Sequence, residues 1–85
     1  MKVSILYFAR LREAIGLDRE VVEVPRDVES VAALRRWIAG RGEPWSSAFA
    51  AAPRIRAAVG RVMADDSTAL QEGAEVAFFP PVTGG

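Results

Sequence analysis

The two ends of the chain each carry a strand-like segment that is apolar on both of its faces. Residues 2–8 and 75–79 alternate with the two-residue period of a β-strand, which predicts one strand at each end. The face that we expect to meet the core carries Val3, Ile5, Tyr7, Val76 and Phe78. The opposite face carries Leu6, Phe8, Ala77 and Phe79. A sheet covered by helices on one side needs only one apolar face, so these segments predict a sheet with an apolar surplus on its other side.

This surplus has two explanations. Either another segment of the chain folds over it, or it is a docking surface for a protein partner. Phe8 and Phe79 fall on the outward register of two different strands, which favours docking. Burying each side chain would stabilise a complex by roughly 2 kcal/mol, so we expect both to anchor a protein partner.

Further strands and turns are predicted between the two ends. A short helical turn covers residues 10–16, and a Val-rich strand follows at 19–24. Alternation continues at 54–60 and predicts another strand. Residues 61–64 then form the arm of a hairpin that ends in a turn at Asp65–Asp66.

Two helices are predicted in the middle of the chain. Ser30 is a suitable N-cap for the first. The apolar stripe of this helix contains Val31, Leu34 and Ile38, with Trp37 beside it. Arg35 and Arg36 are expected to point to water, and Pro44 fits the first position of a short second helix. This order of elements predicts one α+β domain, in which a mixed sheet has helices packed on one face.

The composition excludes several classes of function. The 85 residues contain 11 basic and 11 acidic side chains, so net charge argues for no nucleic-acid partner. No apolar run approaches the length of a membrane span, and the N-terminus is a poor signal peptide, so we expect a cytoplasmic protein with no membrane partner. The absence of cysteine and histidine removes disulfides, thiol catalysis, imidazole acid/base chemistry and thiolate or imidazole metal sites.

The chain ends in "VAFFPPVTGG". Pro80 and Pro81 remove two backbone donors and favour an extended conformation, so the sheet ladder should stop there and the tail should project away. Gly84 and Gly85 have no Cβ, so their backbone fits a channel that other residues would obstruct, although a glycine pair also occurs at chain ends by chance. The α-carboxylate of such an end becomes electrophilic when it is adenylated, after which an amine or a sulfur nucleophile can attack it.

The whole chain resembles the MoaD family of ubiquitin-like sulfur carriers, the small subunits of molybdopterin synthases. The matching blocks are "LYFARLRE" at 6–13, "SVAALRR" at 30–36, "RAAVG" at 56–60 and "LQEGAEVAFFPPVTGG" at 70–85. The resemblance implies a β-grasp domain over residues 1–79 and an extended Gly-Gly tail over residues 80–85. Gly60 departs from the family, whose members often carry Asn there, but it can adopt the same backbone conformation.

The resemblance also implies a function. The carboxylate of Gly85 is adenylated by an activating enzyme that uses ATP and magnesium, and is then converted to a thiocarboxylate. The tail enters the large synthase subunit and donates sulfur to cyclic pyranopterin monophosphate in molybdenum cofactor biosynthesis. The implied partners are this large subunit, in a heterotetramer, the activating enzyme and a sulfur donor protein, and no cofactor is expected on this chain itself.

The residues implied in these steps fall into three groups. Gly85 is the reactive residue. The residues that thread and aim the tail are Gly84, Thr83, Val82, Pro81 and Pro80. The partner interface is expected to contain Phe8, Phe79, Leu6, Ala77 and Arg12. Arg12 and Glu13 match an Arg-Glu pair of the family, and they either pair their charges within the helix or contact a partner.

Three alternative functions share some of these features. A thiamine-pathway sulfur carrier has the same fold and Gly-Gly end but tends to lack the Phe-Phe-Pro-Pro approach. A ubiquitin-like modifier would form isopeptide bonds with substrate lysines, because an amine can capture the same adenylate. A plain interaction domain would explain the outward phenylalanines but not Gly84 and Gly85.

Overall fold

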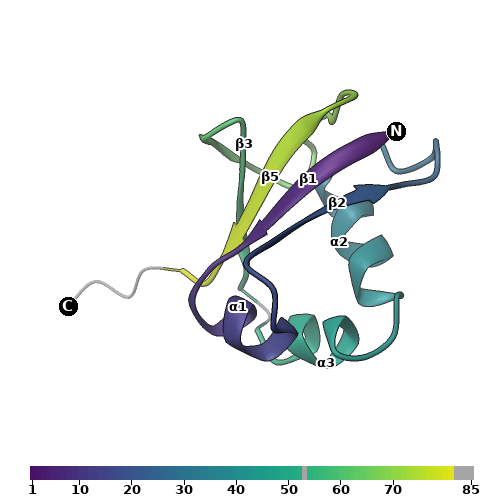
Figure 1. Cartoon of the computed structure of the whole chain (residues 1–85). Helices are drawn as coiled ribbons and strands as arrows, with labels where there is room; N and C mark the ends of the chain where they lie inside the picture. Colours follow the sequence, from purple (N-terminus) through teal and green to yellow (C-terminus); the bar gives the residue numbers. More distant parts are fainter. Residues whose placement is uncertain (53, 82–85) are drawn as a thin grey trace.

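The computed structural model describes residues 1–52 and 54–81 and contains a five-stranded mixed sheet in the order β2-β1-β5-β3-β4 (Figure 1). The elements are β1 (Lys2–Tyr7), α1 (Ala9–Ile15), β2 (Arg19–Glu23), α2 (Val31–Ala39), α3 (Trp45–Ala50), β3 (Arg56–Val59), β4 (Val62–Ala64) and β5 (Ala74–Phe79). The two terminal strands pair in parallel at the centre, with Ile5 opposite Val76. β2 and β3 flank them in antiparallel orientation.

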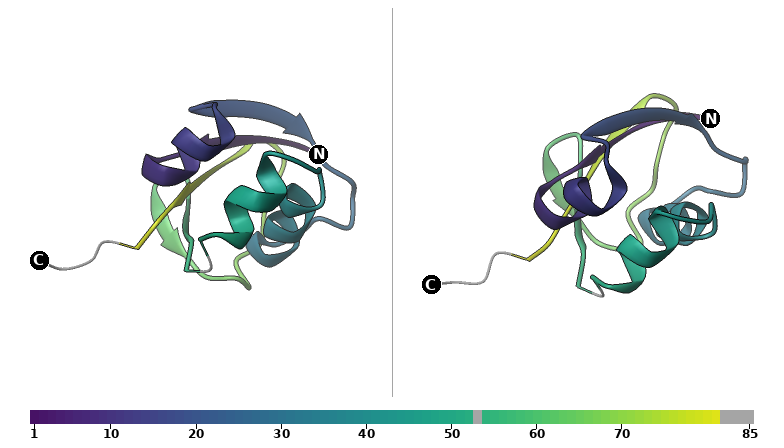
Figure 2. Two further views of the ribbon diagram at one scale, coloured as in Figure 1. Left: turned by 90° about the horizontal axis from the view of Figure 1, so that it is seen from below. Right: turned by 60° about the horizontal axis from the view of Figure 1, so that its bottom comes forward.

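The helices lie on one side of the sheet and at one of its ends. Figure 1 shows α2 and α3 packed on the same side, and α1 at the end where β1 finishes and β5 leaves the sheet. Figure 2 shows the sheet curving around α2 and α3 in two further views. This is the ubiquitin-like β-grasp fold, so the predicted fold class is confirmed.

The core forms where the inward register of the sheet meets α2 and α3. Tyr7, Phe78 and Ala57 occupy one row across three strands and are almost completely buried. Phe49 from α3 packs its ring edge-to-face against Tyr7 and Phe78, at centroid distances of 6.5 Å and 5.5 Å. The predicted stripe of α2 is fully buried and consists of Val31, Leu34 and Ile38. Each of these large side chains contributes roughly 1.5–3 kcal/mol by leaving water, so the sheet and two helices form one core.

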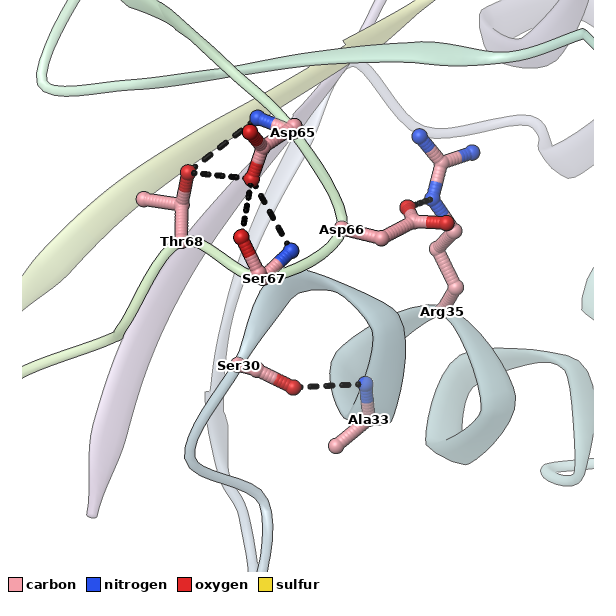
Figure 3. A network of polar contacts seen from close by, with 7 residues as sticks. All are labelled: Ser30, Ala33, Arg35, Asp65, Asp66, Ser67 and Thr68. Carbon is pink, nitrogen blue, oxygen red and sulfur yellow. Dashed lines mark hydrogen bonds and ion pairs between the residues drawn. The ribbon is translucent and has the colours of Figure 1, made fainter.

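The N-terminus of α2 is satisfied by Ser30 and by the turn after β4 (Figure 3). The Ser30 hydroxyl accepts from the Ala33 N–H at 3.2 Å, as predicted for an N-cap. The two amides before it, those of residues 31 and 32, donate to the backbone carbonyls of Thr68 and Asp66 respectively. The Asp65 carboxylate holds this turn together by accepting from the backbone and hydroxyl of Ser67, and these hydrogen bonds lower the pKa of Asp65.

Arg35 does not point to water, and the prediction for this residue is wrong. Its guanidinium lies 5.7 Å from the centre of the Phe78 ring, and its Nε forms an ion pair with Asp66 at 3.0 Å (Figure 3). Residues 31, 34, 35 and 38 share one face of a helix, so the aliphatic stem of Arg35 covers part of the core. The polarity of its head group alone suggested that the whole side chain faces solvent. Arg36, in contrast, is exposed as predicted.

Several predicted boundaries differ from the structure by one or two residues, and three of them have a clear physical reason. β1 ends at Tyr7, because Phe8 already serves as the N-cap of α1. β3 begins at Arg56, since its ladder is set by pairing with the end of β5. Pro44 is the N-cap of α3 and not its first helical residue. In the first turn of this helix, the Ser47 amide donates to the Glu43 carboxylate at 3.0 Å. Strand pairing and hydrogen bonds to nearby side chains fix such ends, and residue preference alone does not.

Candidate functional site

On the face of the sheet away from the core helices, one row of directly opposed residues crosses all five strands and is apolar on β1, β5, β3 and β4. The residues directly opposite one another along this row, from β2 to β4, are Arg19, Leu6, Ala77, Ala58 and Met63. Leu6 and Ala77 are half-buried by their neighbours on the sheet, whereas Met63 is 56% exposed. The outward apolar face therefore extends across the central strands to one edge of the sheet.

Phe8 and Phe79 lie beside this row, at the end of the sheet where the chain leaves it. Phe8 follows β1, donates its N–H to the Phe78 carbonyl at 3.1 Å and is 45% exposed. Phe79 is the last residue of β5, lies opposite Arg56 on β3 and is half-buried. The parallel register of β1 and β5 thus places both phenylalanines next to the root of the tail.

Together these side chains form one surface, which we call the docking face. It consists of Leu6, Phe8, Ala58, Met63, Ala77 and Phe79. The four interface residues predicted on strands lie on it. Ala58 and Met63 were missed, because the sequence indicated the hairpin arm but not which of its side chains shares a face with β5. The two-residue turn of Gly60 and Arg61, both at positive φ, sets that register.

Arg12, the fifth predicted interface residue, lies on α1 and not on the strands that carry the docking face. Arg12 and Glu13 are both exposed, and within residues 1–52 and 54–81 neither takes part in an ion pair. Charge pairing within the helix therefore does not account for them in the described part of the chain. Their role in a partner contact stays a prediction.

The tail begins where the ladder of β5 stops. Pro80 and Pro81 follow Phe79 directly and are half-buried. The predictions for the rest of the tail fall on Val82, Thr83, Gly84 and Gly85, which lie outside the described residues. The structure consequently gives the position of the root of the tail, and the roles of its last four residues remain predictions.

A polar site on the covered side of the sheet was not predicted. The Glu20 carboxylate on β2 accepts from the Tyr7 hydroxyl at 2.6 Å and from the Trp45 indole N–H at 3.2 Å. Arg41 donates to both oxygens of the same carboxylate, at 2.8 Å and 3.1 Å. The Arg41 guanidinium is also stacked near Trp37 and Trp45, at 5.1 Å and 4.0 Å from the ring centres.

We call these residues, Glu20, Tyr7, Arg41 and Trp45, the Glu20 cluster, and their contacts make it a structural anchor. Burial alone raises the pKa of Glu20, but hydrogen bonds from Arg41 and Tyr7 outweigh it and hold this pKa below its ordinary value. Burial, followed by the hydrogen bond to Glu20, raises the pKa of the Tyr7 phenol, so Tyr7 stays protonated. The Glu20 carboxylate thus joins β2 to Arg41, in the loop after α2, and to Trp45 on α3. Because the carboxylate is paired and its neighbouring donors are engaged, the cluster has no free group for acid/base chemistry.

The described residues contain neither a cluster of metal ligands nor a membrane-spanning helix. Across 1–52 and 54–81, no three His, Cys, Asp or Glu side chains gather closely enough to hold a metal ion. In that part of the chain, no helix has the length and hydropathy needed to cross a membrane. The docking face and the root of the tail are two features of the described residues that a partner can contact.

Comparison with known sequences places the chain among small carrier proteins. The model of the ThiS family matches residues 5–85. The molybdopterin synthase sulfur carrier subunit of Escherichia coli (strain K12) is 40% identical over 83 residues, which cover 98% of this chain and 99% of that protein. The subunit with the same name in Haemophilus influenzae is 34% identical with the same coverage.

Solved structures show the same fold. SAMP1 of Haloferax volcanii aligns over the whole of both chains with a TM-score of 0.78 at 24% identity. A protein of Pyrococcus furiosus described as a candidate subunit 1 of molybdopterin converting factor aligns over 96% of this chain and 99% of its own, with a TM-score of 0.76 at 29% identity. A chain from the complex of subunits 1 and 2 of the Helicobacter pylori molybdopterin-converting factor aligns over both full lengths, with a TM-score of 0.66 at 20% identity.

Proposed function

Because the chain belongs to the ThiS family, we propose that it is the sulfur-carrier small subunit of a molybdopterin synthase. The observation that carries the proposal is the 40% identity to a sulfur carrier subunit along almost the entire length of both chains. The tail sequence, which ends in Gly84 and Gly85, supplies the group that such a carrier needs. In this role the chain contributes a delivered sulfur atom and not a catalytic side chain.

The reaction sequence that we propose begins at the carboxylate of Gly85. A carboxylate oxygen attacks the α-phosphorus of ATP on an activating enzyme, and pyrophosphate leaves. A persulfide sulfur on a donor protein then attacks the carbonyl carbon of the acyl adenylate, and AMP leaves, which gives an acyl disulfide. A thiol then reduces the S–S bond, so that the thiocarboxylate is released and the thiol sulfur ends in a disulfide with the donor. The thiocarboxylate sulfur finally attacks a carbon of cyclic pyranopterin monophosphate in the large subunit, and a C–O bond of that substrate breaks. Water then hydrolyses the S–acyl bond, so that the sulfur stays on the pterin and Gly85 regains its carboxylate. In this scheme ATP and magnesium are bound by the activating enzyme and not by this chain.

The docking face supports the partner that this scheme requires. Phe8, next to the root of the tail, and Met63, on the edge strand, are exposed large apolar side chains, and such side chains serve as anchors in protein interfaces. The H. pylori complex shows that a protein of this fold is found together with a second subunit. We assign the docking face to the large subunit, with Pro80 and Pro81 directing the tail toward its active site.

The test is a reconstituted synthase that contains tail variants of this chain. Deletion of Gly85, or addition of one residue after it, is expected to abolish sulfur transfer, since the reactive carboxylate would no longer reach its place in the large subunit. Thermal unfolding should be nearly unchanged, because the sheet already ends at Phe79. A normal rate of sulfur transfer in either variant would overturn the assignment of Gly85.

A further inference from the structure

A groove separate from the docking face lies between α1 and α3. Its volume is about 700 Å³, and one wall is formed by Pro80 and Pro81 at the root of the tail. The helical walls are mainly apolar and include Leu11, Ala14, Ala48 and Ala51. We call it the α1–α3 groove. Figure 1 shows α1 and α3 together at the end of the sheet where β5 leaves, so the groove and the tail share one end of the molecule.

The charges at the rim of the groove are mostly basic. Arg10 on α1 and Arg54 before β3 are both exposed, and neither forms an ion pair within the described part of the chain. The one acidic group of the lining, Glu43, is already engaged, because its carboxylate accepts from the backbone and hydroxyl of Ser47. The groove therefore offers an apolar floor with two cations that lack a counter-charge among the described residues.

The position of the groove limits what can occupy it in a working carrier. Any protein that takes up the tail must approach Pro80 and Pro81, and these two residues belong to the lining. Its surface beside the tail channel will consequently pass over the groove mouth. A complementary segment would place apolar side chains against Leu11 and Ala48 and a carboxylate within reach of Arg10 or Arg54.

We propose that the α1–α3 groove binds an apolar segment of the large synthase subunit that carries at least one acidic side chain. This contact is a second one, in addition to the docking face, and it rests on the proposed function. It fixes the direction in which the tail leaves the carrier, since the segment would pack against the two prolines. Arg10 and Arg54 act as positioning residues, because they hold the partner and do not touch the reacting sulfur.

Two groove variants test the proposal in the full-length chain by titration against the large subunit. Ala51→Trp places a large ring in the groove from an exposed position at the end of α3. It is expected to weaken binding about tenfold or more. Arg54→Glu is expected to weaken binding to a similar degree at low salt, with a smaller difference from the unmodified chain as salt rises. Arg26→Glu makes the same charge change in an exposed loop outside the groove and should bind normally.

Formation of the thiocarboxylate separates this inference from the proposed function. Both groove variants should reach complete loading with sulfur at the end of the reaction, even if the activating enzyme takes up their tails more slowly, and should keep the unfolding temperature of the unmodified chain. If the unmodified chain binds the large subunit but Ala51→Trp and Arg54→Glu bind equally tightly, the groove proposal is overturned and the carrier function stands. If the unmodified chain neither binds the large subunit nor accepts sulfur, the proposed function fails and the groove proposal fails with it.

Discussion

At the scale of single residues, the Glu20 cluster is the feature that sequence reasoning could not find. Its three donors come from positions 13, 21 and 25 residues away from Glu20, so no local pattern links them. Glu20 by itself reads as a polar residue in a strand, and Arg41 as a polar loop residue. Only the packing of α3 against the edge of the sheet brings them together. The Ser30 cap, in contrast, is a local interaction and was predicted correctly.

Replacing Glu20→Gln should destabilise the fold by about 1–3 kcal/mol, because the change leaves the guanidinium of Arg41 without its counter-charge at a site where both side chains are largely buried. The pKa of Glu20 is lower in the folded chain than in the unfolded chain. The stability it contributes is therefore complete above the ordinary glutamate pKa and is lost as the pH falls through the folded pKa.

Urea unfolding of the unmodified and Glu20→Gln chains from neutral to acid pH checks this prediction. The difference in unfolding free energy should shrink as the pH falls. Glu13→Gln is the matched control, since Glu13 is exposed and forms no ion pair within the described residues. A constant difference at every pH would show that the charge of Glu20 does not supply its contribution.

At the scale of elements, strand alternation predicted the two faces of β1 and β5, and the structure confirms both. Period-two alternation is a property of the strand itself, so it is readable without a partner. The pairing of β4 with β3 is different, because its face depends on the length and conformation of the turn at Gly60 and Arg61. The docking face was therefore predicted at its centre and missed at its edge.

Phe8→Ala is expected to weaken binding to the large subunit about tenfold to a hundredfold, with little change in unfolding temperature, because Phe8 is already 45% exposed in the free chain. Phe78→Ala provides the contrast. That side chain is fully buried, so its loss should cost about 3–5 kcal/mol of stability. Titration and thermal unfolding of both variants measure the two effects separately. Unchanged affinity in Phe8→Ala would remove Phe8 from the interface.

Two neighbouring residues on β4 test the extent of the docking face. Met63→Asp should weaken the same complex about tenfold, since it places a charge on the row that crosses the sheet. Val62→Asp is the matched control, because Val62 is also exposed but lies on the opposite register of the same strand. Equal affinities for the two variants would confine the docking face to β1 and β5.

At the scale of the whole molecule, several features to which we assign a function lie at one end. Phe8, Phe79 and the α1–α3 groove all adjoin Pro80 and Pro81, where the chain leaves the sheet. The Glu20 cluster holds α3 against the sheet and so keeps one wall of the groove in place. The order of elements was enough to predict an α+β sheet with helices on one face. The groove was not predictable, because its walls come from segments that meet only in the folded chain.

The mass of the intact chain, measured after incubation with the activating enzyme, a sulfur donor, ATP and magnesium, tests the carrier function most directly. The E. coli sulfur carrier subunit, incubated in parallel, is the positive control. The account predicts a mass increase that corresponds to the replacement of one oxygen by sulfur, located in the terminal peptide that contains Gly85. An unchanged mass while the control is converted, or a covalent ladder on lysines of other proteins in its place, would contradict it.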